Sequence, residues 1–466
     1  MDATHLSQSY ISEEKRFGPL IQESSEFSRK LVSFQANKPE PFSRWFPYKE
    51  GFSKEMVSII LAKTKGKKNL LDPFAGAGTS LFVAAEKGIP STGIELLPLG
   101  KFIFDAITTA HTLDPMNLER TISEARGLSA NLQGPSENYS FRHIKITEKA
   151  FPPETERELN SYLSRIENVS DDPKSKILLR FAVMASLERM SYTRKDGQFL
   201  RWDHRSGKTH GSFQKQRVYS FKEALDFQFG AMLEDIYKQK SGMLNEMKIR
   251  PNLIQGSALR VLPIFKSGSF DLVVTSPPYC NRYDYTRTYA LELAFLGVGE
   301  KGIRELRQEL LSNTVENKEK DRILMNIYEG VGKVEVFDHA KEAFENNELL
   351  RGILSELDKK LQRNELNNPG IFSLVRNYFF EHSFVISELF RVLEDGGEVF
   401  YVNDNVRYAG INIPVDFILS DFAEEAGFRV DKIYKLRESK GNSSQQMKKH
   451  GKVELRKCIY HWVKSG

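Results

Sequence analysis

The sequence predicts an α/β protein built on a doubly wound, mostly parallel, seven-stranded sheet that carries two mainly helical insertions. Short apolar runs of strand length alternate with amphipathic segments of helical period, which is typical of such sheets. The alternation stops twice and resumes after each interruption. We therefore divide the chain into a core in three pieces, 1–110, 251–297 and 371–466, a first insertion over 111–250 and a second insertion over 298–370.

The strands are predicted in chain order from apolar and β-branched runs bounded by turn residues. They cover residues 68–74, 91–95, 252–255, 270–274, 398–402, about 430–436 and 457–463. Helices are predicted where apolar residues recur three and four positions apart. They cover residues 79–87, 153–168, 174–190, 304–311, 342–361 and 373–393. Both insertions leave from the carboxyl ends of strands, where such sheets bind ligands, so we expect both to overhang one crevice.

Composition excludes several classes of protein. With 466 residues, of which 40% are hydrophobic, the chain can bury a large core and is expected to be folded. Its apolar runs are too short and too charged to span a bilayer, and the N-terminus lacks an export signal, which predicts a cytoplasmic protein. Cys280 and Cys458 are the only cysteines, and the histidines are scattered, so we expect neither a disulfide framework nor a bound metal.

The net charge of +5 is concentrated in two segments. Lys and Arg strongly outnumber Asp and Glu over 189–222 and over 429–464. The segment 189–222 also interleaves its cations with aromatic residues, a mixture that pairs phosphate neutralisation with base stacking. The segment 429–464 is explained equally well as a solvated surface.

The strand over 270–274 ends in Thr275-Ser276-Pro277-Pro278-Tyr279. Two prolines cannot continue a sheet ladder, so the chain turns there and displays a hydroxyl, fixed carbonyls and an aromatic ring. A flat ring with an exocyclic amine could stack on Tyr279 while its amine hydrogens bond to Ser276 and to the Pro277 carbonyl. The alternative is a proline-terminated strand whose tyrosine only packs.

The turn Asp72-Pro73-Phe74-Ala75-Gly76-Ala77-Gly78-Thr79 follows the first strand and opens the first helix. Its glycines permit close approach of a ligand, and the helix N-terminus offers hydrogen-bond donors. The turn lacks the third glycine of the dinucleotide pattern and the lysine of a phosphate-binding loop. Glu95, at the end of the second strand, can accept both hydroxyls of a ribose. These parts suit a nucleoside without a pyrophosphate.

Together, the turn over 72–79, the acid at Glu95 and the Ser-Pro-Pro-Tyr motif over 276–279 resemble the S-adenosylmethionine-dependent DNA amino-methyltransferases. Ser276 is similar to the N4-cytosine branch of that family. The resemblance extends to the segment 34–53, which precedes a helix like the segment that closes the methionine end of the family's cofactor site. It also extends to the Gly396-Gly397 turn and to a last hairpin strand. It implies the class I methyltransferase fold, which is Rossmann-like, and S-adenosyl-L-methionine as the cofactor.

The resemblance also implies roles for individual residues. Asp72 would contact the methionine amine, Glu95 the ribose, and Ser257 the adenine amine, at a position where the family often has an acid. The expected cofactor-binding residues are Asp72, Pro73, Phe74, Gly76, Gly78, Thr79, Glu95, Ser257 and Phe52. The residues expected to hold the target base are Ser276, Pro277, Pro278 and Tyr279. Accepting both amine hydrogens would favour a pyramidal nitrogen whose lone pair points at the methyl group.

A base inside duplex DNA would have to flip out to reach such a pocket. Stacking on Tyr279 and phosphate contacts from the basic segments would compensate the cost. The candidate DNA contacts are Arg194, Lys195, Arg201 and Arg205, all in the first insertion, which is the candidate target-recognition region. The competing interpretation is a structural loop in which these cations pair with Asp196 and Asp203.

These observations describe a bacterial or archaeal, nucleoid-associated enzyme that methylates the N4 amine of cytosine at a specific site in double-stranded DNA. It would act in a restriction-modification system beside a companion restriction endonuclease. An N6-adenine product from the same fold is the first alternative. An RNA or protein amino-methyltransferase and a non-catalytic nucleic-acid-binding partner are the others. Cys280 is interpreted as a buried thiol, because Tyr279 separates it from the prolines.

Overall fold

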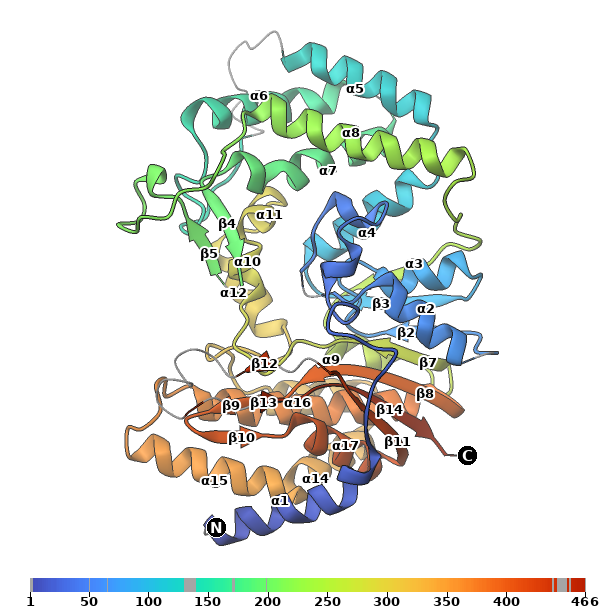
Figure 1. Ribbon diagram of the computed structural model, residues 1–466, viewed down its shortest axis with the longest axis vertical. Helices are drawn as coiled ribbons and strands as arrows, with labels where there is room; N and C mark the ends of the chain where they lie inside the picture. The colour runs from blue at the N-terminus through green and yellow to red at the C-terminus, as the bar shows by residue number, and fades with distance from the viewer. Residues whose placement is uncertain are drawn as a thin grey trace.

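The computed structural model describes residues 3–49, 51–64, 66–129, 140–169, 172–197, 199–437, 440–441, 451 and 454–465. The strands of its central sheet are β1 (Ile21–Glu23), β2 (Leu70–Asp72), β3 (Ser91–Glu95), β6 (Asn252–Gln255), β7 (Phe270–Thr275), β8 (Leu393–Asp404), β11 (Phe428–Lys435) and β14 (Lys457–Lys464). They lie in the order β1-β11-β14-β8-β7-β2-β3-β6 (Figure 1). Only β14 runs antiparallel to its neighbours. The mostly parallel α/β sheet is therefore confirmed, with eight strands instead of the predicted seven.

The additional strand is β1, which forms one edge of the sheet and pairs in parallel with β11 through Ile21 and Ile433. Three residues carry too little hydrophobic pattern to predict a strand. A second difference concerns the Gly396-Gly397 turn. The structure continues β8 through it, and the register with β7 shifts between Phe270 and Leu272, so the glycine pair forms an irregularity within one strand.

The sheet is covered on both faces. Leu70 and Leu272 point to the face that packs on α2 (Lys54–Lys63), α3 (Thr79–Glu86) and α4 (Pro98–Ala110). Their neighbours Leu71 and Val273 point to the face that packs on α16 (Ile371–Val392) and α17 (Val415–Ala426). Because successive side chains alternate between two buried faces, the central strands are apolar at most positions, as in β7 with Phe270, Leu272, Val273 and Val274.

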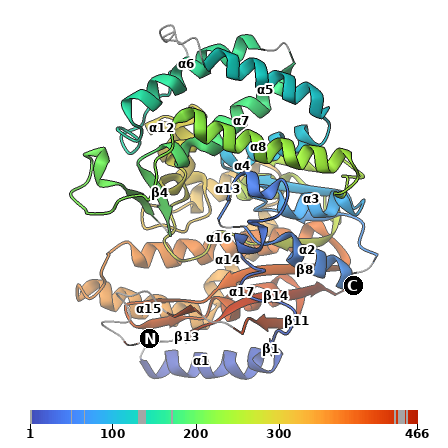
Figure 2. The ribbon, with the colours of Figure 1, turned by 45° about the horizontal axis from the view of Figure 1, so that its top comes forward.

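The first insertion forms a mainly helical layer. It contains α5 (Pro115–Ser129), α6 (Pro153–Val169), α7 (Pro173–Met190), the hairpin β4 (Thr193–Asp196) and β5 (Phe199–Trp202), and α8 (Phe221–Lys240). Its four helices gather at one end of the molecule (Figures 1 and 2). Phe181 of α7 contacts Trp45 with ring centres 5.9 Å apart, so the core continues from the sheet into this layer.

The second insertion extends to the other end of the molecule, where its last two helices pack (Figure 1). It contains α12 (Glu300–Glu309), α13 (Asp321–Gly330), α14 (Val334–Asn346) and α15 (Glu348–Gln362). The single helix predicted over 342–361 is broken at Asn347, whose side chain accepts the N–H of Leu350 at 2.7 Å and caps α15. Helices α14 and α15 pack against α16, and α15 also contacts α1 (Ala3–Phe17). The bulk of this insertion therefore lies away from the expected crevice.

Short elements follow the strands that carry the predicted motifs. They are α9 (Ala258–Val261) after β6, and α10 (Tyr285–Thr288) and α11 (Ala290–Phe295) after β7. Two further antiparallel strand pairs are formed by β9 (Val406–Tyr408) with β10 (Ile411–Ile413), and by β12 (Lys440–Gly441) with β13 (Glu454–Leu455). Within the described ranges, no helix combines the length and the hydrophobicity that crossing a membrane requires.

Candidate active site

A pocket with about 870 Å³ of empty space, part of it open to solvent, lies at the carboxyl ends of β2, β3, β6 and β7. The predicted site residues that line it are Phe52, Pro73, Phe74, Gly76, Thr79, Glu95, Ser257, Ser276 and Pro278. Asp72, Gly78, Pro277 and Tyr279 are not among the lining residues. The fold thus brings the glycine turn and the Ser-Pro-Pro-Tyr motif, which are far apart in sequence, to one cavity of a size that suits a small ligand.

Asp72 does not take the position expected for it. Its buried carboxylate accepts hydrogen bonds from the Thr275 hydroxyl at 2.7 Å, from the Ser80 hydroxyl and from the N–H of Phe74 at 3.1 Å. Burial raises the pKa of Asp72 to about 6, while the two hydroxyls lower it. Instead of facing the pocket, Asp72 ties the glycine turn after β2 to the end of β7, and so sets the two motifs relative to each other.

Gly76 and Gly78 occupy positions that other residues could not. Their φ angles of +55° and +86° lie in the left-handed region. A Cβ on Gly76 would lie 2.9 Å from the Tyr48 ring, and a Cβ on Gly78 would lie 2.7 Å from the Phe104 ring. Gly76 therefore shapes the pocket itself, whereas Gly78 permits the packing beneath the turn and caps α3, whose first residue Thr79 lines the pocket.

Glu95 places a buried carboxylate in the pocket wall. One of its oxygens accepts the N–H of Gly76 at 2.9 Å, and the other accepts the N–H of Leu97 at 2.7 Å. Burial raises the pKa of Glu95 to about 7, and the two backbone hydrogen bonds oppose that rise. Each carboxylate oxygen has a further lone pair, so Glu95 can still accept hydroxyl groups from a ligand.

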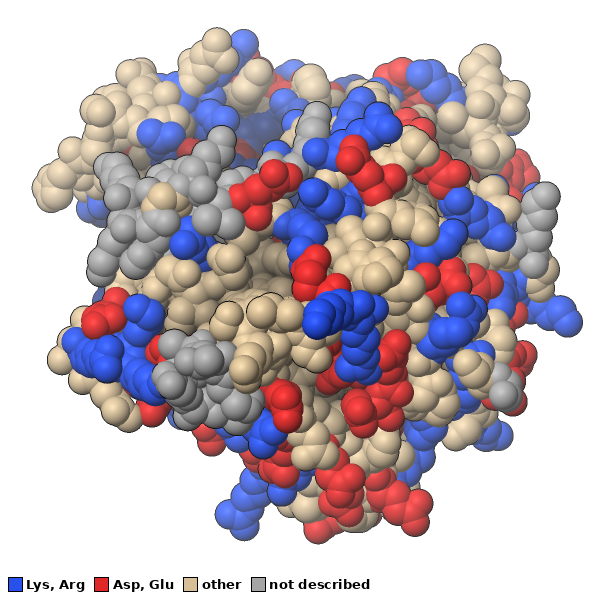
Figure 3. Space-filling view, turned by 60° about the horizontal axis from the view of Figure 1, so that its bottom comes forward, with Lys and Arg blue, Asp and Glu red and all other residues tan. Residues whose placement is uncertain are grey.

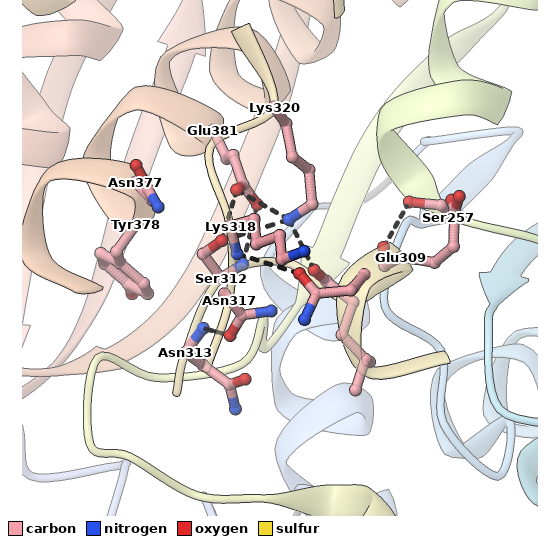
Figure 4. Close-up of polar contacts among 12 residues, drawn as sticks. Ser257, Glu309, Ser312, Asn313, Asn317, Lys318, Lys320, Asn377, Tyr378 and Glu381 are labelled. Atoms are coloured by element: carbon pink, nitrogen blue, oxygen red, sulfur yellow. Dashed lines mark hydrogen bonds and ion pairs between the residues drawn. The ribbon is translucent and has the colours of Figure 1, made fainter. Parts of the chain in front are cut away.

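Ser257 contacts a wall of the pocket that sequence reasoning missed. Its hydroxyl donates to the Glu309 carbonyl at 3.1 Å (Figure 4). Glu309, Leu310 and Leu311 of the second insertion line the pocket. Because its hydrogen is used in this bond, the Ser257 oxygen keeps its lone pairs for a ligand amine. No sequence signal marks these three residues, because they end a charged helix and match no motif.

The segment 34–53 closes another side of the pocket with Phe34, Tyr48 and Phe52. The Tyr48 ring stacks on Tyr289, which lies between α10 and α11, with ring centres 5.3 Å apart and planes 8° apart. This segment was predicted as a unit, but only Phe52 was singled out. Phe34 and Tyr48 could have been identified, because both are aromatic residues of the same segment.

At the end of β7, the hydroxyls of Ser276 and Tyr279 lie 3.1 Å apart. Lys457 of β14 places its Nζ 5.2 Å from the centre of the Tyr279 ring and 3.3 Å from the Asp404 carboxylate. Burial raises the pKa of Tyr279, and the positive charge of Lys457 opposes that rise. Sequence reasoning missed Lys457, because nothing distinguishes it from the other cations of the basic segment 429–464. Much of that segment, including 442–450, lies outside the described residues.

Cys280 is a buried free thiol, as predicted. Burial raises its pKa far above the ordinary range, which keeps the sulfur protonated and unreactive. Its carbonyl accepts the Tyr408 hydroxyl at 2.7 Å. In the part of the chain that the structure describes, no cluster of three or more His, Cys, Asp or Glu side chains is arranged to hold a metal ion.

The four candidate DNA contacts have different surroundings. Lys195 was predicted wrongly: its side chain is only 2% exposed, and its Nζ pairs with Glu188 at 3.0 Å and with Glu292 at 2.5 Å. Its charge is needed to neutralise two carboxylates in a low-dielectric interior. Arg205 pairs with Asp203 at 2.6 Å and Arg201 with Asp196 at 3.0 Å, as the competing interpretation of a structural loop proposed.

Arg194 is exposed and lines a second pocket with about 1030 Å³ of empty space. Lys38 and Arg189 line the same pocket, and none of the three forms an ion pair with a carboxylate of the described residues. Phe34 lines this pocket as well as the first one, so the two are neighbours. On the face shown in Figure 3, Lys and Arg alternate with Asp and Glu around a hollow of other residues, so neither sign of charge dominates there.

Comparison with known proteins gives the family. The chain is 44% identical over 482 residues to the Type II methyltransferase M.AvaI of Nostoc sp., which covers 99% of this chain and 96% of the relative. It is 42% identical to the Type II methyltransferase M.BsoBI of Geobacillus stearothermophilus, over 97% of this chain and 91% of the relative. The Type II methyltransferase M.MvaI of Kocuria varians is 24% identical over 79% of this chain and 77% of its own length. No family model and no solved structure matches. The chain belongs to the Type II DNA methyltransferases, and S-adenosyl-L-methionine is its methyl donor.

Proposed function

We propose that this methyltransferase transfers a methyl group to the exocyclic N4 amine of cytosine at a specific site in double-stranded DNA. The observation that carries the proposal is the position of Ser276. Its side chain lines the same pocket as Glu95 and lies 3.1 Å from the Tyr279 hydroxyl. The pocket therefore combines a carboxylate suited to a ribose with a neutral hydroxyl acceptor suited to an amine hydrogen.

The residues of the pocket divide the work of the reaction. S-adenosyl-L-methionine supplies an electrophilic methyl group, so the protein has to orient the amine rather than activate the methyl. Ser276 and the Pro277 carbonyl accept the two amine hydrogens, which directs the nitrogen lone pair and accounts for most of the rate. Tyr279 stacks on the base, and Lys457 fixes the tyrosine, because a lysine held by Asp404 keeps its charge beside the ring.

The residues proposed to contact the cofactor are those predicted residues that line the pocket away from Ser276. Glu95 accepts the ribose hydroxyls, and Ser257 accepts an adenine amine hydrogen through its free lone pairs. Phe52, with Pro73 and Phe74, provides apolar walls, while Gly76 and Thr79 allow close approach at the start of α3. Asp72 and Gly78 support this turn from behind.

DNA is proposed to contact the first insertion, 111–250, as the target-recognition region. Among the described residues, Arg194, Arg189 and Lys38 form no ion pair with a carboxylate, and they surround one pocket that the half-buried Tyr219 also lines. Such a mixture neutralises phosphates and stacks on bases. Arg201 and Arg205 are secondary contacts, since their charges are already paired with Asp196 and Asp203.

The relatives are Type II methyltransferases, which supports a role in a restriction-modification system with a companion endonuclease, on DNA of a bacterial or archaeal nucleoid. We propose that transfer needs no metal ion, because the electrophile is intrinsic to the methyl donor.

The test is expression in a host without DNA methylation, followed by nucleoside mass spectrometry and single-molecule sequencing. N4-methylcytosine at one recurring sequence is the expected result. N6-methyladenine alone would replace the cytosine assignment by its adenine alternative. Transfer of labelled methyl to RNA and none to duplex DNA would reject a DNA substrate. Absence of any transfer, together with no binding of labelled cofactor, would indicate a non-catalytic partner.

A further inference from the structure

The second insertion reaches the cofactor pocket at one place, the wall segment Glu309–Leu311. Helix α12 ends at Glu309, and the next two residues, Leu310 and Leu311, complete the lining. Arg260 of α9 holds the Glu309 carboxylate through two hydrogen bonds of 2.8 and 2.9 Å. Together with the Ser257 hydroxyl on the Glu309 carbonyl, these bonds fasten the first residue of the wall segment to the core.

The other end of the wall segment is held by a buried ion pair. Lys320 donates to the Leu310 carbonyl at 2.9 Å, to the Ser312 hydroxyl at 3.1 Å and to Glu381 of α16 at 2.7 Å (Figure 4). Glu381 also accepts the N–H of Ser312 at 2.7 Å and its hydroxyl. The side chains of Lys320 and Glu381 are 6% and 0% exposed. All three hydrogens of the ammonium are used, so the geometry of the pair is fully determined.

The Lys320–Glu381 pair is expected to matter more for the geometry of the pocket wall than for the stability of the fold. Replacing a buried ion pair by apolar residues is often tolerated for stability, but in some proteins such a pair selects one geometry among several. Here the ion pair fixes the position of the Leu310 carbonyl, and with it the apolar wall next to Ser257. A flat heterocycle bound between Ser257 and this wall would lose contact area if the wall moved.

We propose that Lys320 is a positioning residue for the adenosine end of the cofactor. It locks the wall segment Glu309–Leu311 of the second insertion onto α16, so that Leu310 and Leu311 pack on the adenine ring while Ser257 receives its amine. The inference rests on the proposed roles of Glu95 and Ser257 at the adenosine. It is independent of which base is methylated, because cofactor binding can be measured without DNA.

The experiment compares Lys320→Met with the wild-type protein by calorimetric titration of S-adenosylmethionine and S-adenosylhomocysteine in the absence of DNA. Losing one ordered contact surface is expected to raise both Kd values about tenfold. The two ligands share the adenosine, so their affinity ratio should stay constant. At saturating cofactor, kcat and the KM for DNA should remain within about twofold of the wild type, since the chemistry is unchanged.

A double variant separates positioning from global stability. Lys320→Met alone leaves the Glu381 charge unpaired and lowers Tm. Lys320→Met with Glu381→Gln removes both charges but keeps an acceptor for Ser312, so Tm should largely return while the Kd values stay high. Recovery of cofactor affinity together with Tm would overturn the proposal.

Arg456→Met is the matched control. Arg456 pairs with the buried Asp416 at 2.6 Å, and neither residue lines the cofactor pocket. This variant should lower Tm without raising the Kd for S-adenosylmethionine. An equal rise in Kd for the control, or a change in the ratio between the two ligands for Lys320→Met, would also reject the assignment.

Discussion

Tyr279 combines two groups that mutation can separate, a ring proposed to stack on the target base and a hydroxyl 3.1 Å from Ser276. Tyr279→Ala should lower methyl transfer by roughly 10- to 100-fold, because a lost base–aromatic stack costs about 1–3 kcal/mol. Tyr279→Phe keeps the ring and should retain most of the activity. Single-turnover methyl transfer measures both variants. Affinity for S-adenosylmethionine should stay near the wild-type value, and its equal loss in Tyr279→Ala would mean that Tyr279 only packs.

Glu95 gives the cofactor site a pH dependence. Burial raises the pKa of this acid from 4.5 to about 7, so the folded protein without cofactor holds the proton more tightly than the unfolded chain. Because folding raises this pKa, the protonated carboxyl adds to the stability of the cofactor-free protein. This contribution is complete below pH 4.5 and is lost as the pH rises through 7. A bound sulfonium and two ribose hydroxyls favour the carboxylate instead. Cofactor affinity should consequently rise between pH 6 and pH 8, by up to about tenfold per pH unit below the pKa.

Titrations at pH 6, 7 and 8 test this dependence, with Glu95→Gln as the comparison. The glutamine keeps an acceptor and the shape of the side chain but has no proton to lose, so its affinity should be weaker and independent of pH in this range. A wild-type affinity that is constant from pH 6 to 8 would show that Glu95 does not titrate on cofactor binding.

The position of a site residue could be predicted from the sequence where the local backbone determines it, and could not where residues distant in sequence determine it. Gly76 and Glu95 could be placed on the pocket because a strand end fixes where they point. Asp72 is the last residue of β2, but its carboxylate is held by Ser80 and Thr275, and the second of these lies on β7. Lys195 directly follows Arg194 and carries the same charge. Because side chains alternate along β4, Arg194 is exposed and Lys195 is buried. No sequence pattern in one strand reveals the carboxylates that it meets there.

At the scale of elements, the hairpin of β4 and β5 offers a matched pair of arginines. Arg194 and Arg201 are direct cross-strand partners and therefore lie on the same face. Arg201 is paired with Asp196 and lies 4.1 Å over the Phe213 ring, whereas Arg194 has no carboxylate partner among the residues described. Arg194→Ala should weaken binding to all DNA sequences and reduce the salt dependence, log Kd against log salt concentration, by about one unit.

Arg201→Ala is the control on the same hairpin. It should change the salt dependence by clearly less, because the charge of Arg201 is already partly neutralised by Asp196. Fluorescence anisotropy with one cognate and one unrelated duplex over a salt series provides the measurement. Equal slopes for Arg194→Ala and the wild type would remove Arg194 from the DNA contacts. An effect confined to the cognate duplex would instead make it a base-reading residue.

Elements with a strong pattern were predicted well, and those without one were not. The helices over 153–168 and 174–190 and the strands over 91–95 and 252–255 agree with the structure nearly to the residue. The break at Asn347 was missed because the apolar spacing runs on from α14 into α15. A single asparagine cap decides the boundary there, and it is stabilised by a further hydrogen bond from Asn347 to Asp421 at 2.6 Å, in α17.

At the scale of the whole molecule, the core and the first insertion share one hydrophobic cluster. Phe181 and Met232 of the insertion belong to the same cluster as Trp45, Phe104 and Leu272 of the core. The cofactor pocket is likewise assembled from several pieces of the chain, with lining residues from 34–52, 73–97, 256–285 and 309–311. The sequence pattern predicts two insertions, but pattern alone cannot tell an insertion that folds separately from one that completes the core. The shared cluster indicates the second kind.

This organisation predicts one cooperative unfolding transition for the whole chain. A separately folding insertion would give two transitions in calorimetry, because domains with little shared core unfold independently. S-adenosylmethionine at about 100 times its Kd should stabilise the folded state by about 2.7 kcal/mol and move the single transition upward as a unit. Differential scanning calorimetry with and without the cofactor, supported by far-ultraviolet circular dichroism at the same heating rate, measures this shift. Two resolved transitions, of which the cofactor moves only one, would show that the shared cluster does not couple the first insertion to the sheet.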